Sequence, residues 1–150
     1  MRWYRHLVIW FFAAAFVGGG IAHLVLGRTQ PESYAAFART ALIPGMDHLW
    51  MTLVMPNIGW LTIVLGVFEL ACGLGILWWR TRLLAVCAIF AFLVFIVILG
   101  YGFETPSPLE DLAVNRLGSI VMIAVLGPLL DQHHKPFKHS PRHREETRRR

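Results

Sequence analysis

Three observations predict an all-α membrane protein, a bundle of four transmembrane helices. The chain of 150 residues is 56% hydrophobic and only 15% charged, with a mean hydropathy of +0.55, whereas soluble domains are about one quarter charged. Four continuous apolar runs, 7–26, 58–79, 83–101 and 112–130, each reach the length of about 20 residues that a helix needs to cross a bilayer. Basic residues also gather on alternate connections between these runs.

The four runs form one predicted membrane domain, residues 1–130. The first contains His23 as its only ionisable residue, and its length exceeds the apolar core of a signal peptide, about 7–15 residues, so we expect it to be retained. Glu69 is the only charged residue of the second run, and the third has none. The fourth carries Asn115 and Arg116 in its first turn. Runs this long and continuous exclude the alternating strands of a membrane barrel.

Positive charge is distributed unevenly. Of the 14 Lys and Arg residues, 11 lie in the head 1–6, the turn 80–82 and the tail 131–150. These three segments share one side if the runs alternate, and the side rich in Lys and Arg faces the cytoplasm. We therefore predict that both termini are cytoplasmic and that the protein lies in the cell's inner membrane.

The first outer connection, 27–57, is too long for a structureless loop, and we expect it to be partly helical. Thr29 is a candidate cap for a helix that begins in this connection, and Pro44 and Gly45 break that helix. The apolar segment 49–55 is too short to cross a membrane and is expected at the outer interface or folded back onto the bundle. The connection either packs over the helix ends or covers a ligand as a lid.

The polar tail, 131–150, carries seven basic residues and four of the seven histidines. We expect it to attract anionic lipids, at about 1 kcal/mol per basic residue. Its histidine spacing matches no strong metal pattern, and no nucleic-acid-reading module accompanies its charge. The expected partners are the bilayer, anionic lipids and other membrane proteins, with no nucleic acid and no metal.

Glu69 is the leading candidate functional residue, because an ionisable group inside a membrane span is costly. It lies 11 residues after Ile58, which is about 16 Å along a helix and close to the midplane. Gly59, Gly66 and Gly73 recur every seven residues on the same face, where small residues let helices approach closely. Glu69 should therefore face the bundle interior, either as a proton-carrying or ligand-binding carboxyl or as a hydrogen-bonding pin between helices.

Three more polar residues lie near the outer edge. We expect His23, Asn115 and Arg116 to form a polar cluster there, with Glu69 a turn or more deeper, and we take these four as candidate ligand-binding residues. The alternatives are a satisfied buried histidine for His23 and an interface anchor for Arg116.

No enzyme motif is present: the chain has no CxxC, phosphate loop, nucleophile elbow or HExxH. No catalytic residue is assigned beyond Glu69 as a candidate proton carrier. The two cysteines, Cys72 and Cys87, are expected at similar depth on adjacent helices, as small packing residues or as a redox pair.

The segment GVFELACGLGIL, residues 66–77, is followed by WWRTR at 78–82 and resembles the second span of the DoxX-like membrane proteins. The resemblance extends over about residues 7–130, and the tail is not part of the family pattern. The positions that match are Gly66, Glu69, Gly73 and Arg82. The resemblance implies a small four-helix membrane protein linked to thiosulfate–quinone oxidoreduction, thiol-redox stress complexes or assembly roles.

These observations lead to three functional hypotheses. The first is an accessory or assembly subunit of a larger membrane complex, respiratory or redox, that acts through helix contacts. The second is a membrane subunit of a quinone- or thiol-linked oxidoreductase, in which Glu69 relays protons near a quinone that His23 and Arg116 polarise. The third is a carrier of a small lipophilic ligand with the outer connection as its lid.

Overall fold

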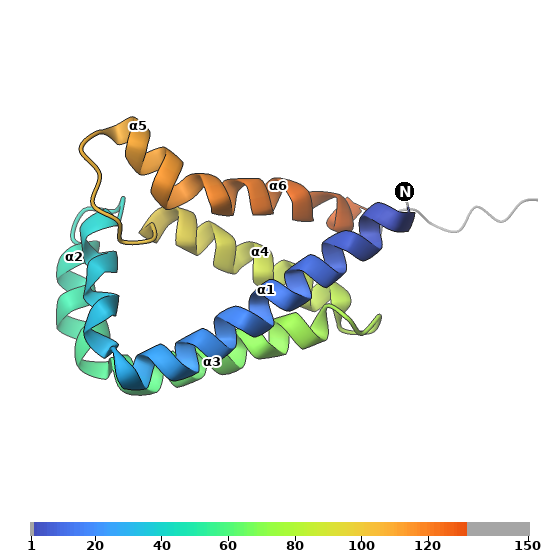
Figure 1. Ribbon diagram of the computed structural model, residues 1–150, viewed down its shortest axis with the longest axis horizontal. Helices are drawn as coiled ribbons and strands as arrows, with labels where there is room; N and C mark the ends of the chain where they lie inside the picture. The colour runs from blue at the N-terminus through green and yellow to red at the C-terminus, as the bar shows by residue number, and fades with distance from the viewer. Residues whose placement is uncertain (1, 132–150) are drawn as a thin grey trace, which may run out of the picture.

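The computed structural model describes residues 2–131, and every regular element in that part of the chain is helical (Figure 1). Four helical stretches are long and apolar enough to cross a membrane: Trp3–Thr29, Met46–Gly75, Arg82–Leu99 and Pro108–Leu130. For these residues, the predictions of an all-α fold and of four long apolar helices are confirmed. The roles predicted for the basic tail concern residues 132–150, which lie outside the described range.

Helices α1 (Arg2–Thr29) and α3 (Ile58–Gly75) lie side by side along most of their length (Figure 1). Glycines allow this approach, because a Cβ on Gly66 would lie 2.8 Å from the carbonyl oxygen of Gly20, and one on Gly73 would lie 2.9 Å from the backbone nitrogen of Val17. Two of the three glycines in the predicted stripe thus pack within the protein. Gly59, the third, is open, since no atom lies within 4 Å of where its Cβ would be.

Helices α4 (Arg82–Leu99) and α6 (Leu117–Asp131) form the second pair. The hydrophobic core lies where the two pairs meet, and its fully buried members include Phe12, Ile76, Ile89 and Leu126. In a bilayer such a core is held by close packing, because the surrounding lipid is as apolar as the side chains.

One end of the bundle holds the start of α1, the turn between α3 and α4, and the end of α6 (right in Figure 1). Helix α3 ends at Gly75, four residues before the predicted end of its span at Trp79. The cause is the turn, where Thr81 Oγ1 donates to the carbonyl oxygen of Gly75 at 2.8 Å and Arg82 Nε donates to that of Ile76 at 2.9 Å. These bonds satisfy carbonyls that a helix end leaves without partners.

The first connection covers the opposite end of the bundle (left in Figure 1). It contains four short helical elements: η1 (Pro31–Thr40), α2 (Met46–Leu49), η2 (Trp50–Val54) and η3 (Met55–Asn57). The predicted helix and its break are confirmed, with Gly45 in a left-handed conformation at φ +82°. The predicted cap is wrong: Thr29 is the last residue of α1 and its hydroxyl donates to Val25, one turn back.

The connection after α4, residues 100–107, leads into the fourth helical stretch earlier than predicted. The helical stretch begins at α5 (Pro108–Asp111), continues through η4 (Leu112–Arg116) and enters α6. Ser107 caps it by accepting a hydrogen bond from the backbone nitrogen of Glu110 at 3.3 Å. The predicted start at Leu112 missed this polar first turn, because hydropathy does not register a cap.

Candidate functional site

A cavity of about 310 Å³ lies between the α1–α3 pair and the α4–α6 pair, beside the first connection. All four long helices contribute to its lining, together with η1 and η2. Its polar residues include His23, Tyr34 and Glu69. The remaining lining is largely apolar, and its aromatic members are Phe16, Phe37, Trp50, Phe92, Phe95 and Tyr101.

The three polar side chains form a continuous line from η1 to α3. Tyr34 Oη and His23 Nδ1 are 2.6 Å apart and share a hydrogen bond. His23 Nε2 lies 3.8 Å from Glu69 Oε1, beyond the usual N–H···O range of about 2.7–3.2 Å. Burial, and then the charge of Glu69, raise the pKa of Tyr34. The phenol therefore keeps its proton in this hydrogen bond.

The carboxyl of Glu69 is almost completely enclosed, with 5% of the residue exposed. Within residues 2–131, its Oε2 is the only buried side-chain nitrogen or oxygen without a hydrogen-bond partner. Leaving such an atom unpaired costs about 1–3 kcal/mol, and more if it is charged. An enclosed carboxyl with spare hydrogen-bonding capacity at a cavity is therefore suited to hold a proton or to pair with a bound molecule.

Aromatic rings line the end of the cavity beside the first connection. The ring centroids of Tyr34 and Phe37 are 6.0 Å apart, and those of Phe37 and Trp50 are 5.8 Å apart. The indole Nε1 of Trp50 donates to the carbonyl oxygen of Tyr34 at 2.8 Å. This bond ties η2 to η1, so the two elements form one cover over this end of the cavity.

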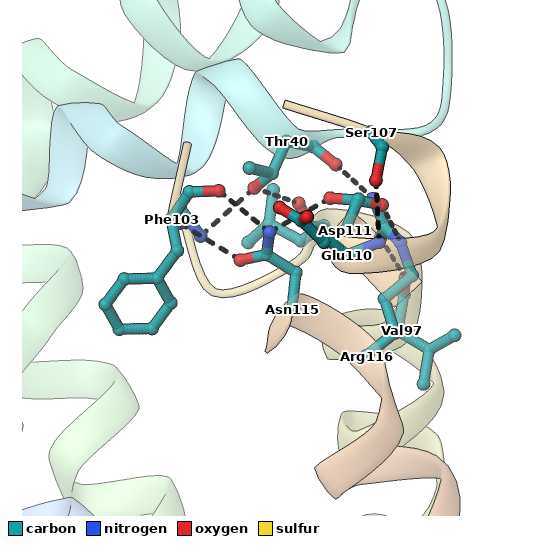
Figure 2. A network of polar contacts seen from close by, with 10 residues as sticks. Thr40, Val97, Phe103, Ser107, Glu110, Asp111, Asn115 and Arg116 are labelled. Carbon is teal, nitrogen blue, oxygen red and sulfur yellow. Dashed lines mark hydrogen bonds and ion pairs between the residues drawn. The ribbon is translucent and has the colours of Figure 1, made fainter. Parts of the chain in front are cut away.

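The structure separates Asn115 and Arg116 from His23 and Glu69. Arg116 is buried, and its three nitrogens donate to Asp111 Oδ2 at 2.8 Å, to the carbonyl of Val97 at 2.6 Å and to the carbonyl of Thr40 at 2.7 Å (Figure 2). Asn115 Nδ2 donates to the other oxygen of Asp111 at 2.9 Å. With its donors engaged in this way, Arg116 is not arranged to polarise a ligand beside Glu69.

The remaining bonds of this network join the first connection and η4 to the loop after α4. Asn115 exchanges hydrogen bonds with the backbone of Phe103, at 2.8 and 3.0 Å. Thr40 Oγ1 donates to the carbonyl of Leu99 at 2.9 Å and accepts from the backbone nitrogen of Gly102 at 3.1 Å. The network therefore fixes η1 to α4, η4 and the loop between them (Figure 2), and positions the cover of the cavity.

Other predicted positions lie away from the cavity lining. Cys72 and Cys87 are both free; Cys72 is buried in the core and Cys87 is exposed. Arg82 donates to carbonyls at the end of α3.

The sequence predicts Glu69 a turn or more deeper than His23, but the structure brings their side chains within 4 Å. Tyr34 as the partner of His23, and Trp50 as part of the cover, were not predicted. The signal that pointed toward Tyr34 was its helical spacing with Phe37, which predicts a shared face but not the element that this face contacts.

Comparisons with protein-family models, curated proteins and solved structures give no match to this chain. Membership of the DoxX-like family stays a prediction from the pattern of the second span.

Proposed function

We propose that this multi-pass membrane protein binds a small lipophilic molecule in the cavity between its two helix pairs. The observation that carries the proposal is the combination of a largely apolar cavity of about 310 Å³ with one enclosed carboxyl whose Oε2 lacks a hydrogen-bond partner. Small-molecule sites are concave, of about 300–1,000 Å³, and mostly apolar with a few polar groups that orient the ligand. The cavity fits each of these criteria.

Access from the membrane supports a lipophilic ligand. Ala15 of α1 and Phe95 of α4 line the cavity and are exposed rather than buried, so the cavity is open beside these two helices. A molecule dissolved in the bilayer can therefore reach the cavity between helices without passing through water. The first connection then acts as the cover, with Tyr34 and Trp50 over the outer end.

The mass of any molecule that stays bound to the intact protein tests the proposal. The intact protein is extracted from its own membrane in mild detergent, and native mass spectrometry measures what remains bound. We expect a small non-phospholipid molecule on the wild-type protein and its loss in Ala15→Phe, which places a ring in the cavity. The matched control is Ala91→Phe on α4, an exposed residue outside the cavity lining. A wild-type protein that carries only phospholipid would contradict the proposal.

A second candidate function is that of an accessory subunit in a larger membrane complex. The supporting observation is an exposed face of α1, where Ala14, Gly18 and Ala22 follow one another at four-residue spacing. No atom lies within 4 Å of a Cβ built on Gly18, and small residues at this spacing let another helix approach closely. Native mass spectrometry should then find stoichiometric foreign subunits, which Gly18→Leu would release.

The orientation that we propose has both termini in the cytoplasm of a cell whose inner membrane holds the protein. The charge distribution supports it, because the turn 80–82 and the head 1–6 are basic and lie at the same end of the bundle (Figure 1). The cavity and its cover then lie in the outer half of the membrane.

A further inference from the structure

We propose that the molecule bound in the cavity is a lipophilic organic cation, an amine or quaternary ammonium compound whose positive group pairs with Glu69. This inference rests on the proposed ligand-binding function and names the chemical class of the ligand.

The first argument is the balance of charge in the cavity. Its lining includes Glu69 but no Lys or Arg. The nearest basic group, His23 Nε2, is 3.8 Å from Oε1, and the other ring nitrogen is already bonded to Tyr34. An ionised carboxyl enclosed without a partner is expensive in a membrane. A bound cation supplies the missing charge, whereas a bound anion would add to the repulsion.

The second argument is the aromatic lining. Phe16 and Phe92 meet edge to face, with ring centroids 5.8 Å apart, and Phe37 and Trp50 form the cover. Aromatic faces attract cations within about 6 Å of the ring centroid, and cages of such rings bind quaternary ammonium groups. A carboxyl that lines the same cavity as these rings offers such a cation both ionic and cation–π contacts.

The third argument concerns hydrogen-bond donors. A neutral ligand that presents carbonyl oxygens needs donors, but the two phenols in the lining have partners. Tyr34 is bonded to His23 at 2.6 Å, and Tyr101 is bonded to Ser119 at 2.7 Å. The carboxyl of Glu69 in the lining has one oxygen without a hydrogen-bond partner, and as a carboxylate it accepts hydrogen bonds and attracts positive charge. This favours a ligand with a cationic or donor group over one with acceptors alone.

Size limits the ligand further. An apolar protein cavity of about 150 Å³ holds one benzene molecule, and this cavity has about twice that volume. The fitting cation therefore has one aromatic ring with an alkylammonium group, or two small rings.

A matched pair of probes separates charge from shape. Benzyltrimethylammonium and neopentylbenzene have nearly the same shape, but the first has a positive nitrogen where the second has carbon. Binding of each labelled compound to the full-length protein in lipid nanodiscs is measured by equilibrium dialysis, with binding to empty nanodiscs subtracted. We expect the cation to bind at least about tenfold more tightly than its neutral isostere.

Two variants locate the contact. Glu69→Gln should reduce the preference for the cation to below about twofold while neopentylbenzene still binds. Phe92→Leu, which keeps the carboxyl, should weaken the cation more than the neutral probe. If Glu69→Gln does not fold, the preference of the wild-type protein and its reduction in Phe92→Leu decide the question.

The outcomes distinguish the two proposals. Equal binding of both probes to the wild-type protein would overturn the cation inference and leave the lipophilic site standing. A cation preference that survives in a folded Glu69→Gln protein would also overturn it. If neither probe binds, both the inference and the proposed lipophilic site are contradicted.

Discussion

The carboxyl of Glu69 in α3 packs directly against Gly19 in α1. A Cβ on Gly19 would lie 2.6 Å from Glu69 Oε2, a distance that real Cβ atoms do not occupy. A Cβ on Gly18, the preceding residue, would have no atom within 4 Å of it. The two neighbouring glycines therefore differ in role. Gly19 leaves room for the carboxyl of Glu69, and Gly18 lies on the open face of the helix.

The first prediction concerns the space that Gly19 leaves for the carboxyl of Glu69. Gly19→Ala should displace the carboxyl or separate α1 from α3, at a cost of about 1–3 kcal/mol in the free energy of unfolding, and it should reduce occupancy of the cavity. Gly18→Ala is the matched control and should change stability by no more than the gain in helix propensity, up to about 1 kcal/mol. Denaturant titration in mild detergent measures stability, and native mass spectrometry measures occupancy. Equal effects of both variants would contradict the assigned role of Gly19.

The second prediction concerns the buried arginine. Arg116→Gln leaves Asp111 without its ion-pair partner and removes donors from the carbonyls of Val97 and Thr40. Breaking a buried pair on one side costs about 3–5 kcal/mol, and we expect a loss of stability of that order.

Its control is an arginine at the same end of the protein. Arg39 pairs with Glu104 at 2.9 Å, but 54% and 75% of their side chains are exposed. Exposed pairs contribute about 0–1 kcal/mol, so Arg39→Gln should have little effect in the same denaturant titration. A small effect of Arg116→Gln would show that its network does not hold the outer connections.

The sequence was sufficient to predict the spans, because a continuous apolar run of about 20 residues has few alternatives to a membrane helix. It was less reliable at the span ends. Thr81 and Arg82 end α3 early, and Ser107 starts the fourth helical stretch early, through hydrogen bonds that hydropathy does not reveal.

The contact between Glu69 and His23 could not be predicted from depth along each run. Gly20 of α1 packs against Gly66 of α3, so His23 lies three residues from this contact toward the first connection and Glu69 three residues from it toward the α3–α4 turn. Gly19 and Gly20 have no side chains, so the long side chains of Glu69 and His23 can extend toward each other along α1. The predicted difference in depth of a turn or more agrees with this register, and the side chains bridge it.

The third prediction concerns the cover. Trp50→Phe keeps an aromatic ring but removes the hydrogen bond from Nε1 to Tyr34, which is worth about 1 kcal/mol. Local opening of η1 should become about fivefold more frequent, and amide hydrogen exchange of residues 34–40 should accelerate by a similar factor. Trp60→Phe is the control, because Trp60 donates only to the nearby side chain of Asn57, in an exposed hydrogen bond. Unchanged exchange in Trp50→Phe would mean that the hydrogen bond does not hold the cover.

The fourth prediction concerns orientation across the membrane. The basic turn 80–82 should face the cytoplasm, and the loop that contains Glu104 should face the opposite side, because Lys and Arg near span ends favour the cytoplasmic side. Single cysteines at Trp79 and Glu104, both exposed, are introduced separately in a protein that carries Cys72→Ala and Cys87→Ala. In spheroplasts with a sealed inner membrane, a membrane-impermeant maleimide should label Glu104→Cys at once and Trp79→Cys only after permeabilisation. The reverse labelling would place the cavity in the cytoplasmic half of the bilayer and refute the orientation derived from charge.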